Sequence, residues 1–513
     1  NTYPNSVKLN DAYEYLVGVY YTTKNYEEAL KSIDRIERQD IKLLEAKQRL
    51  AYYRGVELYN EGDYLSAVEK FKISLDNNYD PKLKAAATYW TAESFFHLGD
   101  FDNADNYFSE FLASSRARSL DYFDQAYYNM AYTFYERSKF NGSIFWFREY
   151  LDNANPLSLG LINDSYLRIG DCYFIQKEYK NAIEYYDKAV EMDLKNQDYA
   201  ALQSAISSGV LGNYDEKAKK LEKAIKRNVK SVYVDDALFE LGKTLLILGK
   251  EDDALSYYNQ LVNDFPKSNY LSNAYLKIGL IHYNRKADDL ALSSFDKVVK
   301  NFSGTSAAKE AIEKIRKIYI DKGDAKAFQD YVNGVPFADI SKNELDSTSY
   351  VIAENAYLSA DCEKATRDLS NYLKEYPNGL FSLNAHYYRG DCEARSNFFQ
   401  EAVLDFEYVI SRPPNKFTLK ALQALGELYP AIGEKEKAIE IFERLLETAD
   451  RSKDLEEAHR TLMQLHLEME NYDTAAYHAE ILLAEDIVDN KVWEQAKMIL
   501  AKANFNKENY EEA

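Results

Sequence analysis

The sequence has few of the residues that tight turns require. It contains 19 glycines and 9 prolines among 513 residues, which is about half of their usual combined share. Folds built from β-strands need many turns that carry these two residues. The scarcity therefore argues against a strand-rich fold and favours a chain made mostly of helices.

The sequence also has few cysteines, no long apolar run and no excess of positive charge. The three cysteines, Cys172, Cys362 and Cys392, are too few and too scattered for a disulfide scaffold or a four-ligand zinc site. No run of about 18 apolar residues exists, so no membrane-spanning helix is expected. The net charge of −21 lacks the basic footprint of nucleic-acid binding, so no nucleic-acid partner is expected. The 46% hydrophobic content is enough for a core and excludes disorder.

One phrase recurs along the whole chain, Gly-Asp-Tyr-x-x-Ala or a variant, with an aromatic residue four positions after the alanine. We call this alanine position the anchor. The mean spacing between anchors is near 37 residues, which marks a repeat architecture. The anchors are Ala29, Ala67, Ala104, Ser143, Ala182, Lys217, Ala254, Ala291, Phe328, Ala365, Ala402, Ala438, Ala475 and Ala513.

The positions around each anchor follow helical spacing. A small residue stands twelve positions before the anchor and a large one nine before it, and apolar residues stand four and seven after it. Spacings of three, four and seven indicate two helices in each repeat, joined by a tight turn at the Gly-Asp pair. One such hairpin cannot bury its own apolar face, so neighbouring hairpins must stack.

This register resembles the tetratricopeptide repeat, whose usual period is about 34 residues. The three extra residues fall between repeats, as in Pro266-Lys267-Ser268-Asn269-Tyr270. This longer connector is similar to those of outer-membrane assembly and Tol-Pal-associated periplasmic proteins of Gram-negative bacteria. The resemblance implies an all-α, right-handed superhelical solenoid of about thirteen helix-turn-helix repeats. No cofactor and no metal are expected.

Two anchors depart from the small-residue rule, and they suggest how the chain divides. Lys217 and Phe328 replace the alanine, and a phenylalanine at a close-approach position should force two helices apart or shift them. We expect an array segment at 1–302, a degenerate repeat and candidate hinge at 303–345, and a second segment at 346–513. The alternative at 303–345 is a distorted but continuous repeat. Residues 3–6 parallel the connector at 265–268, and residues 509–513 stop inside a helix, so both ends are expected to be cut from a longer array.

Few side chains suggest chemistry. No nucleotide-binding, zinc-protease or EF-hand motif occurs. His459 and His466 are seven residues apart and share a helix face, which favours a core or surface pair over a metal site. Cys362 and Cys392 could approach across adjacent repeats and pair in an oxidising compartment, although two separate half-buried thiols are the favoured interpretation.

A basic cluster stands out on this acidic chain. It could meet an acidic partner or an anionic headgroup, but a solvated helix face is the favoured interpretation. Its members are Lys217, Lys219, Lys220, Lys223, Lys226, Arg227 and Lys230.

The resemblance also implies where partners bind. In the similar family, a concave face is lined by first-helix residues 18, 15, 11, 8 and 7 positions before the anchor, and here many of them are aromatic. Rings with a polar tip suit protein recognition, although the alternative is that many only pad helix interfaces. We call these thirteen residues the aromatic row: Tyr52, Tyr59, Tyr89, Phe96, Tyr128, Tyr132, Tyr135, Phe174, Phe239, Tyr283, Tyr350, Tyr357 and Tyr387.

One subfunction of the family is disfavoured. Arrays that hold an acidic chaperone tail use an asparagine eleven positions before the anchor. Here that position carries no asparagine and is acidic in several repeats, as at Glu93, Asp171 and Asp391.

The sequence thus predicts a non-enzymatic scaffold that binds protein or peptide segments on an aromatic-lined surface. The connector resemblance suggests the periplasm and a role in cell-envelope assembly or secretion, with attachment to the outer membrane through a lipid anchor in a preceding segment. Two alternatives remain open. One is the regulatory or sensor arm of a larger kinase or peptidase, and the other is a cytoplasmic adaptor.

Overall fold

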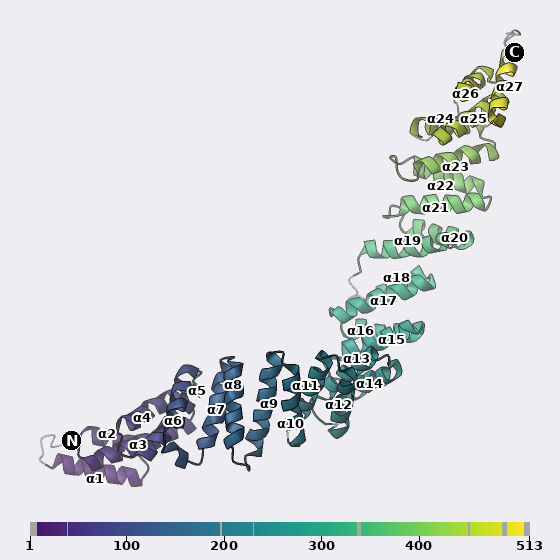
Figure 1. The fold of residues 1–513 in the computed structure, drawn as a ribbon. Coiled ribbons are helices and arrows are strands. Elements are labelled where there is room, and N and C mark those ends of the chain that lie inside the picture. Colours follow the sequence, from purple (N-terminus) through teal and green to yellow (C-terminus); the bar gives the residue numbers. More distant parts are fainter. Residues whose placement is uncertain are drawn as a thin grey trace. The chain divides into compact units, whose positions relative to one another are not determined.

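The computed structural model describes residues 8–37, 39–194, 197–228, 230–335, 340–449, 452–484 and 490–506. Within these residues the chain forms 27 α-helices and one short 3-10 helix, and no strand (Figure 1). The predicted all-α repeat fold is confirmed. The two ends that the sequence suggests are cut, together with Ala513, lie outside the described residues.

The chain consists of two compact units, Asn1–Ala274 and Tyr275–Ala513. In the first unit lie α1 (Leu9–Thr22), α2 (Tyr26–Asp34), α3 (Ile41–Asn60), α4 (Tyr64–Asp76), α5 (Pro81–His97), α6 (Phe101–Ala113), η1 (Ala117–Ser119), α7 (Phe123–Glu136), α8 (Phe140–Asn153), α9 (Leu159–Ile175), α10 (Tyr179–Glu191), α11 (Gln197–Val210), α12 (Tyr214–Arg227), α13 (Val234–Ile247) and α14 (Glu251–Asp264).

The boundary between the units falls inside α15 (Leu271–Asn284). The second unit continues with α16 (Asp288–Asn301), α17 (Ser306–Lys322), α18 (Ala325–Asn333), α19 (Lys342–Leu358), α20 (Cys362–Glu375), α21 (Ser382–Arg395), α22 (Phe399–Ile410), α23 (Thr418–Ala431), α24 (Lys435–Thr448), α25 (Ser452–Glu468), α26 (Tyr472–Ala484) and α27 (Asn490–Asn506). Paired in order, α1 to α26 make thirteen hairpins, followed by α27, as the period predicted.

The turn between the two helices of a hairpin has the same backbone conformation in every repeat. The residue five positions before the anchor has a positive φ in all thirteen hairpins. Glycine adopts this region without strain, which explains Gly62 and Gly99, but Lys177 and Asn397 occupy the same position elsewhere. The two degenerate repeats keep it too, through Gly212 and Gly323, so the register continues through both.

The aspartate of the recurring phrase starts the second helix. Asp63 and Asp100 accept hydrogen bonds from the backbone N–H groups of Ser66 and Asn103, at 3.1 and 3.2 Å. These N–H groups have no partner within the helix, and an aspartate side chain supplies one. The Gly-Asp pair therefore sets both the turn and the start of the next helix.

Anchors and glycines allow the helices to pack closely. All thirteen described anchors are buried. The glycine twelve positions before the anchor lies against the aromatic ring four after it: a Cβ on Gly170 would stand 2.7 Å from the ring of Tyr186, and one on Gly426 would stand 2.5 Å from the ring of Phe442. The ring therefore occupies the space that a larger residue on the first helix would need.

The two unusual anchors are accommodated differently. Lys217 is buried, and its Nζ reaches Glu240 Oε2 at 2.6 Å. Phe328 is 1% exposed and packs beside Tyr319 in the core of the second unit. Its helix, α18, has only nine residues, whereas α16 and α20 have 14 each. The division into units falls at 274/275, and a hinge at 303–345 stays a prediction.

Candidate partner-binding surface

Every member of the aromatic row lies on the first helix of its hairpin. None is exposed: Tyr89, Phe239 and Tyr350 are buried, and the other ten are half-buried. The first helices α1, α11, α17, α23 and α25 contribute no member. The buried three serve the core, so only the ten half-buried rings can offer a face to a partner.

The row is densest on α7. The ring centroids of Tyr128 and Tyr132 are 5.0 Å apart, and those of Tyr132 and Tyr135 are 6.1 Å apart. Other members contact aromatic residues outside the row, as Tyr59 does with Trp90 at 4.9 Å and Tyr387 with Phe417 at 4.3 Å. The row is therefore one part of a wider set of packed aromatic rings.

Carboxylates of the following repeat hold the tyrosine hydroxyls of α7. Tyr128 and Tyr132 both donate to Asp164 Oδ2 on α9, the first at 2.8 Å. Burial and the nearby Asp164 raise the pKa of both tyrosines, so the hydroxyls stay protonated donors. These bonds fix the position of two rings in the row.

Asp164 connects to a second acid through an arginine. Arg168 lies 3.4 Å from Asp164 and 2.6 Å from Asp171. Asp171 Oδ1 also accepts hydrogen bonds from the hydroxyls of Tyr186 on α10 and Tyr199 on α11, at 2.8 and 2.9 Å. A continuous polar network therefore runs from α7 to α11 beneath the first-helix face.

Glu93 plays the same part on α5. Its carboxylate accepts from Tyr59 at 3.5 Å and from the amide of Asn129. Burial raises the pKa of Glu93 to about 7, and hydrogen bonds from Tyr89 and Tyr59 oppose that rise. The carboxyl group is therefore close to half-ionised at neutral pH.

The second unit repeats the pattern. Tyr357 donates to Asp391 at 2.9 Å, and Arg395 pairs with the same carboxylate at 2.6 Å. Tyr350 donates to Glu354 at 2.7 Å. Four acids at the position eleven before the anchor thus accept from tyrosines, and sequence reasoning missed this. The sequence does carry a sign of these contacts, because the position eleven before the anchor is acidic in several repeats.

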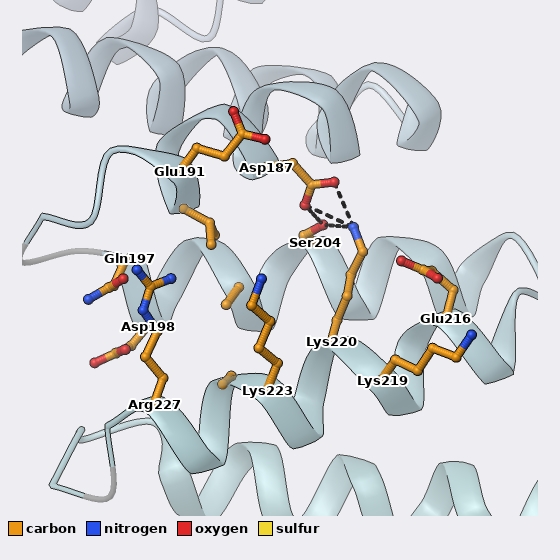
Figure 2. Close-up of a pocket in the computed structure, with 13 residues that line it drawn as sticks. Asp187, Glu191, Gln197, Asp198, Ser204, Glu216, Lys219, Lys220, Lys223 and Arg227 are labelled. Carbon is orange, nitrogen blue, oxygen red and sulfur yellow. Dashed lines mark hydrogen bonds and ion pairs between the residues drawn. The ribbon is translucent and has the colours of Figure 1, made fainter.

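The basic cluster on α12 is partly used by the fold. Lys220 Nζ lies 2.7 to 2.8 Å from both Asp187 oxygens and 2.7 Å from Ser204 Oγ (Figure 2). Arg227 pairs with Asp193 at 2.6 Å. Lys219 and Lys223 remain exposed at the edge of a cavity of about 290 Å³ between α10, α11 and α12. Acidic and basic side chains line this cavity in equal number, so its charge favours neither sign.

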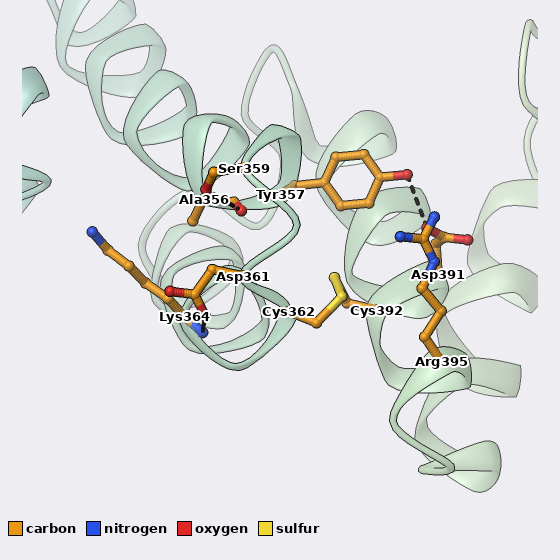
Figure 3. Close-up of a disulfide and its surroundings, with 9 residues drawn as sticks. All are labelled: Ala356, Tyr357, Ser359, Asp361, Cys362, Lys364, Asp391, Cys392 and Arg395. Carbon is orange, nitrogen blue, oxygen red and sulfur yellow. Dashed lines mark hydrogen bonds and ion pairs between the residues drawn. A yellow bond between two sulfur atoms is a disulfide. The ribbon is translucent and has the colours of Figure 1, made fainter.

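The two later cysteines form a disulfide, contrary to the favoured sequence interpretation. Cys362 is the first residue of α20 and Cys392 lies within α21, with a Cα–Cα distance of 5.1 Å (Figure 3). The repeat packing brings the start of one second helix against the next first helix, and helical spacing within the sequence does not reveal this approach. Cys172 is a free, buried thiol, and burial raises its pKa to about 12.

The described residues hold neither a metal-binding cluster nor a membrane-spanning helix. Among them, no group of three or more histidine, cysteine, aspartate or glutamate side chains is arranged to hold a metal ion. In the same part of the chain, every helix is too short or too polar to cross a lipid bilayer.

Comparison with known proteins gives the class. Family models of the tetratricopeptide repeat match residues 52–119, 164–196, 236–268, 273–305 and 421–456. The chain is therefore a tetratricopeptide-repeat protein. Such repeats are typically non-catalytic interaction modules, which makes the chain a protein–protein interaction scaffold. No protein with a curated description matches it.

Solved structures similar to this chain include three of differing length. The crystal structure of the MamA protein is 22% identical, covering 39% of this chain and 96% of that one, with a TM-score of 0.30. PilF of Pseudomonas aeruginosa is 18% identical, covering 48% and 99%, with a TM-score of 0.31. YrrB, described as a TPR protein with an unusual peptide-binding site, is 19% identical, covering 37% and 91%, with a TM-score of 0.30.

Proposed function

We propose that the chain holds extended segments of other proteins against the half-buried members of the aromatic row. The observation that supports this is the fixed position of those rings: each has one side in the core, and hydroxyls such as those of Tyr128 and Tyr357 are tied to carboxylates. A surface ordered before binding loses little entropy when a partner docks. Rings that keep an accessible edge also supply large contact area.

The binding proposal is tested by photo-crosslinking in cells that express the native full-length protein. A benzoylphenylalanine at Tyr135 or Phe174, both half-buried on first helices, should form adducts with partner proteins. The control is Tyr257, a half-buried tyrosine on the second helix α14. Adducts at the control position that equal those at Tyr135 and Phe174 would contradict the assignment of the binding face.

Once an adduct identifies a partner segment, its affinity for variants of the chain can be measured. Changing Tyr135 and Phe174 together to alanine should weaken binding of that segment about tenfold or more, since aromatic anchors dominate interface energy. Tyr257→Ala should leave the affinity within about twofold. Circular dichroism of each variant checks that the helices remain.

We further propose that the protein works in the cell envelope of a Gram-negative bacterium, in assembly or secretion. Support comes from the connector between repeats and from the Cys362–Cys392 disulfide, because disulfides persist mainly in oxidising compartments such as the periplasm. Peptide mass spectrometry of the native protein, alkylated before lysis and left unreduced, tests this. We expect the linked peptides in the envelope fraction, and free alkylated thiols would contradict the proposal.

A further inference from the structure

Three of the six histidines meet in the hairpin of α25 and α26. His459 and His466 lie on one face of α25, and His478 on α26 sits against both. The Nδ1 atoms of His459 and His478 are 2.9 Å apart. The ring of His478 is also nearly parallel to that of His466, with an interplanar angle of 11° and centroids 5.9 Å apart. We call these three residues the histidine cluster.

Two of the three rings are buried, and His459 is half-buried. His466 is 7% exposed and His478 is 5% exposed. Both ring nitrogens of His466 are buried without a hydrogen-bond partner. Nearby on the same two helices are the buried apolar residues Met463 and Ala479. A positive charge on the ring of His466 or His478 would therefore be poorly solvated.

Few charged groups act on the two buried rings, those of His466 and His478. From α24, the exposed Glu443 acts on His466, and it opposes the effect of burial on that ring. His478 feels His459 and His466 across the hairpin, and its neighbour Tyr477 contacts its ring at 5.2 Å. Among the described residues of α27, no charged side chain shifts the pKa of His478. Burial first, and then the two other histidines, lower that pKa to about 4.

The close Nδ1–Nδ1 contact limits how many protons the cluster accepts. When both rings are neutral, one Nδ1 donates its hydrogen and the other accepts it. Protonation of both rings places two N–H groups and two positive charges against each other at 2.9 Å. Both rings can therefore carry a proton only after His478 moves away or the hairpin opens.

We propose that the histidine cluster is an acid-sensitive switch that opens the α25–α26 hairpin as the pH falls below ~6. This inference is independent of the proposed function. Opening removes the contacts of α25 with α26, and so exposes the two helix faces that meet inside the hairpin. Acid would therefore raise the share of molecules in which the facing sides of α25 and α26 are uncovered.

The sign and size follow from proton linkage. An unfolded histidine has its ordinary pKa of about 6.5, whereas His478 in the closed hairpin has one of about 4. The stabilisation is complete above about pH 6.5 and is lost progressively as the pH falls toward 4. For His478 alone, the ratio of open to closed hairpins should rise roughly twenty-fold between pH 7 and pH 5.

Hydrogen exchange measured by mass spectrometry on the whole chain tests the switch. Rates are corrected for the intrinsic pH dependence of exchange, and peptides from 452–484 are followed between pH 7 and 5. We expect their protection to fall roughly twenty-fold, while peptides from the histidine-free hairpin α13–α14 change less than about twofold. In His478→Phe, which keeps a ring but cannot be protonated, the fall should largely disappear.

The same fall in His478→Phe as in the wild type, or unchanged protection of 452–484 in the wild type, would overturn the proposal. If the variant does not fold, NMR of ring-labelled histidines in the wild type decides the matter. We expect one histidine resonance, lost in His478→Gln, to remain neutral at pH 5. Titration of all six histidines near the ordinary value would also refute the switch.

Discussion

Tyrosine is the residue that distinguishes this chain, with 45 copies in 513 residues. Its hydroxyls donate hydrogen bonds to acids that lie between helices. Asp171 accepts from two tyrosines, and so does Asp164. A buried carboxylate without donors is costly, and a tyrosine supplies a donor together with a large apolar ring. Part of the tyrosine excess is therefore explained by the need to satisfy acids that lie between repeats.

Glu93 gives the sharpest pH prediction at this scale. Its pKa in the folded chain is about 7 against an ordinary 4.5. The folded chain therefore holds this proton more tightly than the unfolded chain does, and the folded state loses stability as the pH rises from about 4.5 to 7. Glu93→Gln cannot ionise. At pH 8 we expect the free energy of unfolding of the variant to be roughly 1–3 kcal/mol larger than that of the wild type, so the variant is the more stable protein.

Thermal unfolding at two pH values checks the Glu93 prediction. Near pH 4.5 the wild-type carboxyl group is protonated in the folded state and about half-protonated in the unfolded state, so the two proteins should melt at nearly the same temperature. Other acids titrate equally in both and cancel from the difference. A Glu93→Gln midpoint that is equal to or below the wild-type one at pH 8 would show that the carboxylate is not strained by burial.

Two glycines of α9 offer a matched pair. A Cβ on Gly170 would stand 2.7 Å from the ring of Tyr186, which is 1% exposed, whereas a Cβ on Gly160 meets nothing within 4 Å. Gly170→Ala should destabilise the protein by about 1–3 kcal/mol through overpacking. Gly160→Ala should be neutral or stabilising by up to about 1 kcal/mol. Urea unfolding followed by circular dichroism measures both, and equal effects would refute the packing explanation.

At the scale of helices, the repeat register predicted much of the fold. Which face of each helix is buried depends on spacings of three, four and seven, and those can be read along the chain. The partners of the buried polar groups could not be read in the same way. Tyr357 reaches an acid 34 residues away on the next hairpin, and Cys362 meets Cys392 across the same kind of junction. These contacts depend on how adjacent hairpins are offset in space.

At Phe328 the repeat register alone gives the wrong expectation about stability. Every neighbouring anchor is alanine, so the repeat pattern suggests that Phe328→Ala restores a better fit. The structure predicts the reverse, because the ring is 1% exposed and fills the core beside Tyr319. Its removal should leave a cavity and cost about 3–5 kcal/mol.

The control for Phe328→Ala is an exposed phenylalanine in the same unit. Phe398 is 57% exposed, so Phe398→Ala should change stability by no more than about 0.5 kcal/mol. Thermal unfolding of the two variants gives the comparison. A stabilised Phe328→Ala would mean that the repeat consensus, and not the observed packing, governs this position.

For the molecule as a whole, packing is local along the sequence. The well-packed helix pairs of the described chain are neighbours or next neighbours in order. In such an array, stability is close to a sum of terms within and between adjacent repeats. A substitution should therefore destabilise its own hairpin most and have little effect beyond a few repeats. This also explains how the degenerate repeats at Lys217 and Phe328 are tolerated.

This locality can be tested by combining one substitution from each unit, Gly170→Ala and Phe328→Ala. The two sites share no packing partner in the described structure, so their effects should add within about 0.5 kcal/mol. Hydrogen exchange should rise around α9 and α10 in the first variant and around α17 and α18 in the second. Each variant should leave the peptides around the other site unchanged, and the double variant should show both patterns superimposed. A single cooperative loss of protection over all 27 helices in either single variant would contradict local packing, and would require that the repeats fold as one unit.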